Sequence, residues 1–286
     1  MEKETLKKWA RGIAVMLLGS LVYIAGQAAA TGLGGGLAML VNHKTFKGVM
    51  THLDVYAGYL LWANVICDLM VIVVLVKLKW AVLACDYFRP KKNRITILWL
   101  ALFALTIMLP ELHMQEILDL SGVGETTDKF LEGAMTDPFG VMSIGIIVPI
   151  VEEVLFRGVI LGTLLKLLGQ KNHWWAILIS AFLFGGFHGN MAQFVSAGWA
   201  GVLYGWVAYR TKSLIPSIVL HAVGNSAACI LALVTPDDMD EISDLFSNLF
   251  HGDLTTMYIA LGVLFCAAMA CLSQIIIRVR KDSNRF

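Results

Sequence analysis

The sequence is poor in charge. Only 15% of its 286 residues are Asp, Glu, Lys or Arg, whereas 58% are hydrophobic, so the chain is far more apolar than a typical soluble domain. The charged residues cluster between apolar stretches of roughly 17 to 25 residues, the length that crosses a bilayer as a helix. Because lipid offers the backbone no hydrogen bonds, we expect each stretch to be helical. The predicted fold class is an all-α, polytopic transmembrane helical bundle surrounded by membrane lipid.

Several motifs are also missing. No basic stripe with interleaved aromatics occurs and the net charge is only +1, so we expect no nucleic-acid partner. No H-E-x-x-H motif and no C-x-x-C pair occur. We interpret the five cysteines as packing residues; they are Cys67, Cys85, Cys229, Cys266 and Cys271. With no internal repeat and no long linker, residues 1–286 form one predicted domain.

The apolar stretches predict about eight membrane spans. They lie at about residues 12–41, 56–76, 95–110, 139–166, 174–193, 196–209, 214–234 and 255–277. The first is expected to break near the glycines at 32–36. On the sixth, Gly198, Gly201 and Gly205 predict close helix packing rather than phosphate binding.

The charges between the spans predict the orientation. Basic residues lie at the N-terminus and after the second, fourth, sixth and eighth spans, which places both termini in the cytoplasm. The segments 111–138 and 235–253 are acidic and should be external, although Lys44 and Lys47 also fall on the external side. Within the first acidic segment, residues 111–133 are expected to form a short amphipathic helix at the interface.

Very few ionisable groups lie inside the spans. A charge near the bilayer centre costs at least ~2.5 kcal/mol, so such a group indicates a function unless a partner explains it. The groups are Asp68, Glu152, Glu153, Arg157, His188 and His221. All except Asp68 lie in the fourth, fifth and seventh spans.

The fourth span carries two adjacent glutamates. Glu153 and Arg157 are four residues apart, so we expect them to pair on one helix face. Glu152 points about 100° away and is left without that partner. Pro149, three residues earlier, removes a backbone donor and is expected to kink the span. The alternative interpretation is a structural ion pair beside one protonated glutamate.

Depth in the membrane brings the polar groups together. At 1.5 Å per residue from the cytoplasmic ends, Glu152 and His188 lie about 21 Å deep, His221 about 10 Å and Asn225 about 16 Å. His221 and Asn225 share one face of the seventh span because they are four residues apart. All four groups can therefore meet in one cavity that receives water from the cytoplasm.

This set can hydrolyse a peptide without a Ser or Cys nucleophile. A buried carboxylate beside an imidazole can take a proton from water, and a second imidazole and a carboxamide can donate to a developing oxyanion. A second version stays open, in which Glu152, His188 and His221 hold one divalent metal such as zinc, with water as the fourth ligand.

The ordered motifs Glu152-Glu153-x-x-x-Arg157, Phe184-x-x-x-His188 and His221-x-x-x-Asn225 resemble the CAAX protease and bacteriocin-processing family of intramembrane endopeptidases. The resemblance covers about residues 139–234, the expected catalytic core. It implies that Glu152 and His188 activate water and that His221 and Asn225 stabilise the oxyanion. It also implies that Glu153 and Arg157 support the site. Both a metalloprotease and a metal-free glutamate mechanism are associated with the family.

Two other functions remain open from the sequence. Buried carboxylates and histidines also serve proton relays, so an ion-coupled transporter is one alternative. Asp68, four residues after Asn64, is the one feature that the protease interpretation leaves unexplained. A non-catalytic membrane scaffold is the other. Short loops and basic cytoplasmic segments are typical of bacterial members, which predicts a bacterial cell-membrane protein acting on a membrane-associated peptide, leader or lipidated protein.

Overall fold

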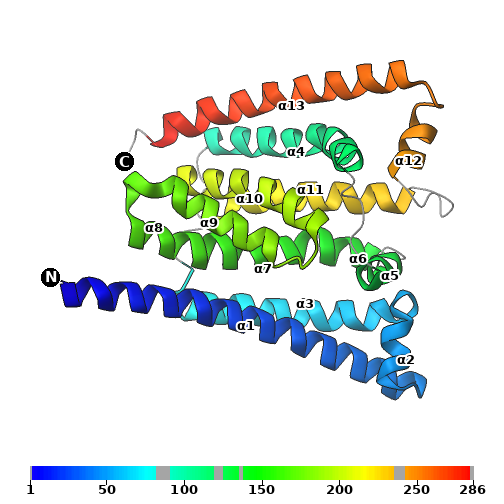
Figure 1. Cartoon of the computed structure of the whole chain (residues 1–286), viewed down its shortest axis with the longest axis horizontal. Helices are drawn as coiled ribbons and strands as arrows, with labels where there is room; N and C mark the ends of the chain where they lie inside the picture. The colour runs from blue at the N-terminus through cyan, green and yellow to red at the C-terminus, as the bar shows by residue number, and fades with distance from the viewer. Residues whose placement is uncertain (1, 82–90, 119–124, 135–137, 235–241, 284–286) are drawn as a thin grey trace.

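The computed structural model describes residues 2–81, 91–118, 125–134, 138–234 and 242–283. Within these residues all regular structure is helical and the helices pack as one bundle, which confirms the expected all-α polytopic fold (Figure 1). The long helices are α1 Glu2–Asn42, α3 Leu53–Lys77, α4 Lys91–Ile117, α9 His173–Gly186, α10 Met191–Thr211, α11 Ile215–Val234 and α13 Leu254–Ser283. The short ones are α2 Phe46–Thr51, α5 Glu125–Ala134 and α12 Ile242–Leu249.

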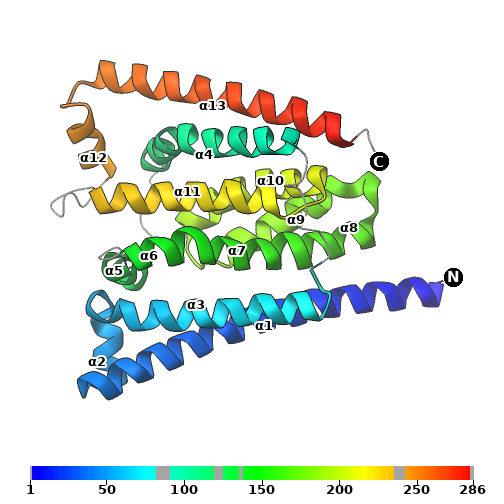
Figure 2. The same ribbon diagram turned by 180° about the vertical axis from the view of Figure 1, so that it is seen from behind.

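The predicted fourth span is a composite helix. Two π-helical segments interrupt its α-helical turns without ending the helix, and the 3-10 turn η3 Gln170–Asn172 follows it. The segments are α6 Pro138–Met142, η1 Ser143–Ile147, α7 Val148–Glu153, η2 Val154–Leu161 and α8 Gly162–Leu168. Figure 2 shows this helix running along the bundle between α3 and α11.

Six described helices are long and apolar enough to cross a membrane, so the chain is an integral, multi-pass membrane protein. They are Lys3–Asn42, Leu53–Lys77, Arg94–Ile117, Phe139–Leu168, Ile215–Val234 and Leu254–Val279. The predicted spans 174–193 and 196–209 correspond to α9 and α10. With only 14 residues, α9 is about 21 Å long and too short to cross the bilayer core. α10 has 21 residues but is less apolar than the six.

Both termini lie at the same end of the bundle (Figure 1). This end also carries the basic ends of α3 and α8, at Lys77 and Lys166, and the Lys and Arg excess predicts that it faces the cytoplasm. Lys44 and Lys47 beside α2 lie at the opposite end, as their place in the sequence predicts. Parts of the acidic loops, and Arg89, fall outside the described residues.

The expected break in the first span does not occur. α1 is a continuous helix through all four glycines, and two of them, Gly34 and Gly35, pack against neighbouring residues. Gly34 is buried, and a Cβ built on it would lie 2.7 Å from Leu60 Cα and 2.7 Å from Tyr59 O on α3. The absence of a side chain lets the two helices approach closely, as small residues do in membrane interfaces.

The external amphipathic helix expected at 111–133 is also not one element. Residues up to Ile117 continue α4 through Pro110, and α5 begins separately at Glu125. The apolar residues of the 111–117 segment extend the apolar run of α4, so the helix does not stop at the first acid. Of the cysteines, Cys67, Cys229, Cys266 and Cys271 are free thiols as expected, and Cys85 lies outside the described residues.

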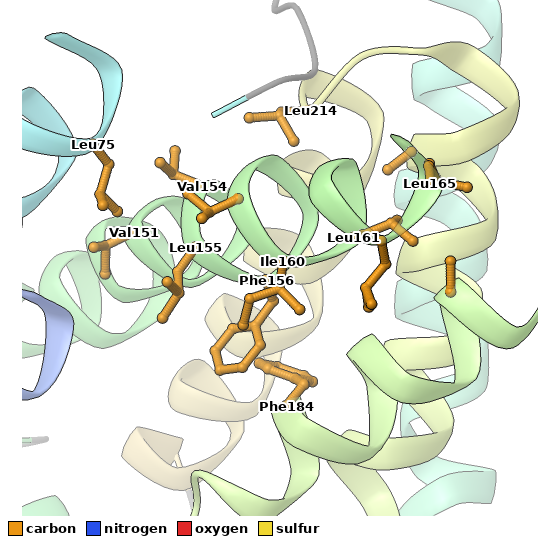
Figure 3. Close-up of a cluster of buried hydrophobic side chains, with 14 of the residues drawn as sticks. Leu75, Val151, Val154, Leu155, Phe156, Ile160, Leu161, Leu165, Phe184 and Leu214 are labelled. Atoms are coloured by element: carbon orange, nitrogen blue, oxygen red, sulfur yellow. The ribbon is translucent and has the colours of Figure 1, made fainter. Parts of the chain in front are cut away.

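The largest buried apolar cluster surrounds the composite helix (Figure 3). Val151, Leu155 and Phe156 on this helix are almost completely buried, between Leu75 of α3 and Phe184 of α9. On α10, Gly201 and Gly205 are buried, and Cβ atoms there would lie 3.1 to 3.2 Å from side chains of neighbouring helices. The close packing predicted for these two glycines is confirmed. The polar residues of the site are therefore held in a tightly packed part of the membrane bundle.

Replacing Gly34 by alanine should destabilise the protein by about 1 to 3 kcal/mol, because the new Cβ would overlap the α3 backbone. Gly32 provides the matched control. It is exposed on the same helix, and a Cβ built on it would have no neighbour within 4 Å. Thermal unfolding in detergent should show a lower Tm for Gly34→Ala and an unchanged or higher Tm for Gly32→Ala. Equal Tm values for the two variants would contradict the proposed packing role.

Candidate active site

Pro149 determines how the composite helix meets α11. A residue with an N–H at position 149 would bond the carbonyl four or five residues earlier, at Gly145 or Ile144, but proline has no such donor. In the structure Asn225 Nδ2 donates to Ile144 O at 3.4 Å and Ser226 Oγ donates to Gly145 O at 3.2 Å. The helix continues with a π-helical segment before α7 instead of breaking. α11 is thereby docked beside the two glutamates.

Arg157 and Glu153 form the ion pair that their spacing predicts. Both side chains are fully buried, and Arg157 NH1 lies 2.8 Å from Glu153 Oε1. The other end of the guanidinium donates to Gly201 O of α10 at 3.2 Å. Its carbon lies 4.3 Å from the ring centre of Phe184 and 5.2 Å from that of Tyr204, within reach of cation–π attraction. The buried charge therefore has ionic, hydrogen-bonding and aromatic partners.

His221 of α11 bridges the two adjacent glutamates. Its Nδ1 lies 3.1 Å from Glu153 Oε1, and its Nε2 lies 3.6 Å from Glu152 Oε2. The ring stacks on Tyr204 with 4.8 Å between centres and meets Phe184 edge-on. Because Glu153 is held as an anion by the guanidinium, we assign the Nδ1 proton to His221, donated to Glu153. The second nitrogen then faces the carboxylate that has no cation of its own.

His188 does not lie inside a helix as the sequence predicts. α9 ends at Gly186, and His188 sits in the turn between α9 and α10, half-buried. Its Nδ1 lies 2.9 Å from Phe184 O, and its ring meets the Phe184 ring edge-on. Asn190 caps α10 and donates to His188 O at 3.2 Å. His188 lies close enough to interact electrostatically with Glu152.

Some of the expected site residues contact one another, whereas others only lie near them. Glu152, Glu153, Arg157 and His221 form one connected polar network, and His188 lies near it. Asn225 is one helical turn beyond His221 and contacts the backbone of η1. Glu152 is only 8% exposed, so the free carboxylate is nearly dry.

Comparison with known proteins matches residues 135–227 to the family described as Type II CAAX prenyl endopeptidase Rce1-like. Two bacterial relatives also match. The Membrane-embedded CAAX protease MroQ of Staphylococcus aureus is 27% identical over 169 residues, 57% of this chain. YdiL of Bacillus subtilis, a candidate membrane peptidase, is 29% identical over 115 residues, 39% of this chain. Residues 135–227 are therefore similar to the CAAX protease family, as the resemblance of the motifs predicts.

All six residues of the expected site lie within the part that matches the CAAX protease family model. The matched part of the chain covers 46% of the length of YdiL and 68% of MroQ. No solved structure matches the chain.

The structure does not assemble the alternative metal site predicted from Glu152, His188 and His221. Among the described residues, no group of three His, Cys, Asp or Glu side chains is placed to hold a metal ion. His221 and His188 each have one ring nitrogen on a protein acceptor, at Glu153 and Phe184. Their remaining nitrogens and Glu152 do not converge on one point, so we assign no chemical step to a metal.

Sequence reasoning missed Tyr204, Tyr23 and Gln27, and it left Asp68 unexplained. Tyr204 contacts both His221 and Arg157, but a single tyrosine in a membrane helix gives no distinctive signal. Asp68, unexplained by the sequence, is 1% exposed, and Gln27 Nε2 donates to its Oδ1 at 2.7 Å. Tyr23 and Asp68 both lie near Glu152. Gln27 within an apolar stretch was the available signal, because intramembrane amides usually join helices.

Replacing Arg157 by methionine should destabilise the protein by about 3 to 5 kcal/mol, because Glu153 would stay buried without its cation. Adding Glu153→Gln to that variant should restore much of the loss, since the uncompensated charge is removed. Thermal unfolding of both variants and of the control Lys171→Met, at an exposed cation, would measure this. If the double variant is no more stable than Arg157→Met alone, the loss of stability does not come from leaving Glu153 buried without its cation.

Proposed function

We propose that this chain is an intramembrane endopeptidase that hydrolyses a peptide bond with water activated by Glu152. The carrying observation is the network in which the buried Arg157 neutralises Glu153, while His221 bridges Glu153 and Glu152. Glu153 is neutralised by the ion pair with Arg157, whereas Glu152 has no cation of its own. Glu152 is therefore the group available for proton transfer.

In the first step Glu152 takes a proton from water while the water oxygen attacks the carbonyl carbon of the substrate. The O–H bond breaks, the C–O bond forms, and the carbonyl electron pair moves to its oxygen. The proton on Glu152 then passes to the amide nitrogen as the C–N bond breaks. A carboxylate with no cation of its own suits this role because it can accept the proton from water and later release it to the amide nitrogen.

His188 completes the water site in this proposal. With its Nδ1–H donated to Phe184 O, its Nε2 lone pair is free to accept a hydrogen bond from the attacking water. Its place in a turn, half-buried, also leaves it accessible to a substrate arriving in the membrane. His188 thus orients the water while Glu152 removes the proton.

His221 and Asn225 are the proposed oxyanion donors. When protonated, His221 Nε2 can donate to the developing negative charge, and Glu153 stabilises the resulting imidazolium. Asn225 uses one of its two amide hydrogens on Ile144 O and keeps the other for the oxyanion. Both donors stand on α11, so docking of this helix sets their position.

The proposed substrate is a membrane-associated peptide or protein, such as a leader peptide or a lipidated protein. The site lies within helices that cross the membrane, so a scissile bond must enter the bilayer region to reach Glu152. MroQ, a relative over 57% of this chain, is named as a membrane-embedded CAAX protease. This supports the same class of reaction here.

Glu152→Gln and His188→Ala should each lower the cleavage rate of a membrane-peptide substrate by about 10² to 10⁴. The first removes the group that takes the proton, and the second removes the group that orients the water. Glu116→Gln, at a glutamate that contacts His113 in α4, should leave the rate unchanged. The variants must insert and unfold like the wild type. Wild-type rates in Glu152→Gln would disprove the site, and no cleavage by the wild type would favour the scaffold alternative.

The step assigned to Glu152 predicts activity without a bound metal. Enzyme purified with a strong chelator, and shown by elemental analysis to contain far less than one metal per chain, should retain its cleavage rate. Loss of activity that zinc alone restores would contradict this mechanism and would support the set Glu152, His188 and His221 as ligands.

A further inference from the structure

A pocket of about 600 Å³ opens at the cytoplasmic end of the bundle, between the start of α1, the segment after α3, and α8. Its described lining contains five cations and one carboxylate. They are Lys7, Lys8, Arg11, Lys79, Lys166 and Glu4. Glu4 lies 3.7 Å from Lys7 and therefore compensates only part of the positive charge. The lining is suited to an anion.

The deeper wall of the pocket is apolar. It includes Gly12, Val15 and Leu167, and Gly12 packs so closely on Leu167 that a built Cβ would lie 2.7 Å from its Cδ1. Beyond the pocket, α1 presents Leu18, which lies seven residues after Arg11 and therefore on the same side of the helix, and which is 47% exposed. The positive rim thus continues into an exposed apolar helix face that runs toward the membrane interior.

We infer that this pocket binds the headgroup of an anionic phospholipid. The phosphate lies among the five cations, and the acyl chains follow the exposed apolar face of α1. A free phosphate ion would use the cations alone and would not account for the apolar continuation. Trp80 in the lining is a residue type that concentrates at the membrane interface, where headgroups lie. This inference does not depend on the proposed protease activity.

The test removes three of the five cations with Arg11→Gln, Lys79→Gln and Lys166→Gln in the full-length protein. The matched control removes three exposed cations from the same end that do not line the pocket, with Lys77→Gln, Arg94→Gln and Lys171→Gln. Native mass spectrometry in detergent, titrated with phosphatidylglycerol or phosphatidylcholine, counts the lipids that remain bound. Thermal unfolding confirms that both variants are folded.

The wild type should retain phosphatidylglycerol in preference to phosphatidylcholine. The pocket variant should bind phosphatidylglycerol more weakly by on the order of 100-fold, since each of the three cations near an anionic headgroup contributes about fivefold. The control variant should stay within about threefold of the wild type. An equal loss in the control, or equal retention of the two lipids, would overturn the inference. Displacement of phosphatidylglycerol by millimolar inorganic phosphate would overturn it in favour of a soluble anion.

Discussion

The buried guanidinium of Arg157 is the charge on which the polar network depends. Two adjacent carboxylates inside a membrane helix would be costly to bury together as anions. Arg157 keeps Glu153 ionised, and the ionised Glu153 orients His221, whose second nitrogen is then aimed at Glu152. The same charge requires a glycine on α10, because a Cβ at Gly201 would lie 3.1 Å from the guanidinium.

The parts of the site that could be predicted are local. The Glu153–Arg157 pair follows from helix geometry, because residues four apart on one helix must face the same way. The bridging position of His221 could not be predicted, since it depends on how α11 packs against α7, 68 residues earlier in the chain. Nor could spacing reveal which ring nitrogen faces which glutamate. The roles of Glu152, His188 and Asn225 remain predictions.

The same division holds for the fold. Apolar runs predicted the membrane helices well, because length and hydropathy are properties of each segment. They did not show that α9 ends at Gly186. The predicted span 174–193 ran through the turn at His188 and Gly189, which ends the helix with a φ of 74° at the glycine. The prediction that the first span would break near Gly34 was also wrong. A glycine that weakens an isolated helix can strengthen a pair of helices, and only the position of α3 decides which effect applies.

The missing N–H of Pro149 has a mechanical consequence for the opposite helix. α11 is fastened at two heights, at His221 against the glutamates and at Asn225 and Ser226 against the carbonyls of η1. A helix slips by steps of about 1.5 Å and 100° per residue, so a slip by one residue would release both attachments together. The distance between His221 and Glu152 is therefore fixed by helix register rather than by side-chain freedom. The carbonyls near Pro149 and the glutamates after it together set the register of the seventh span.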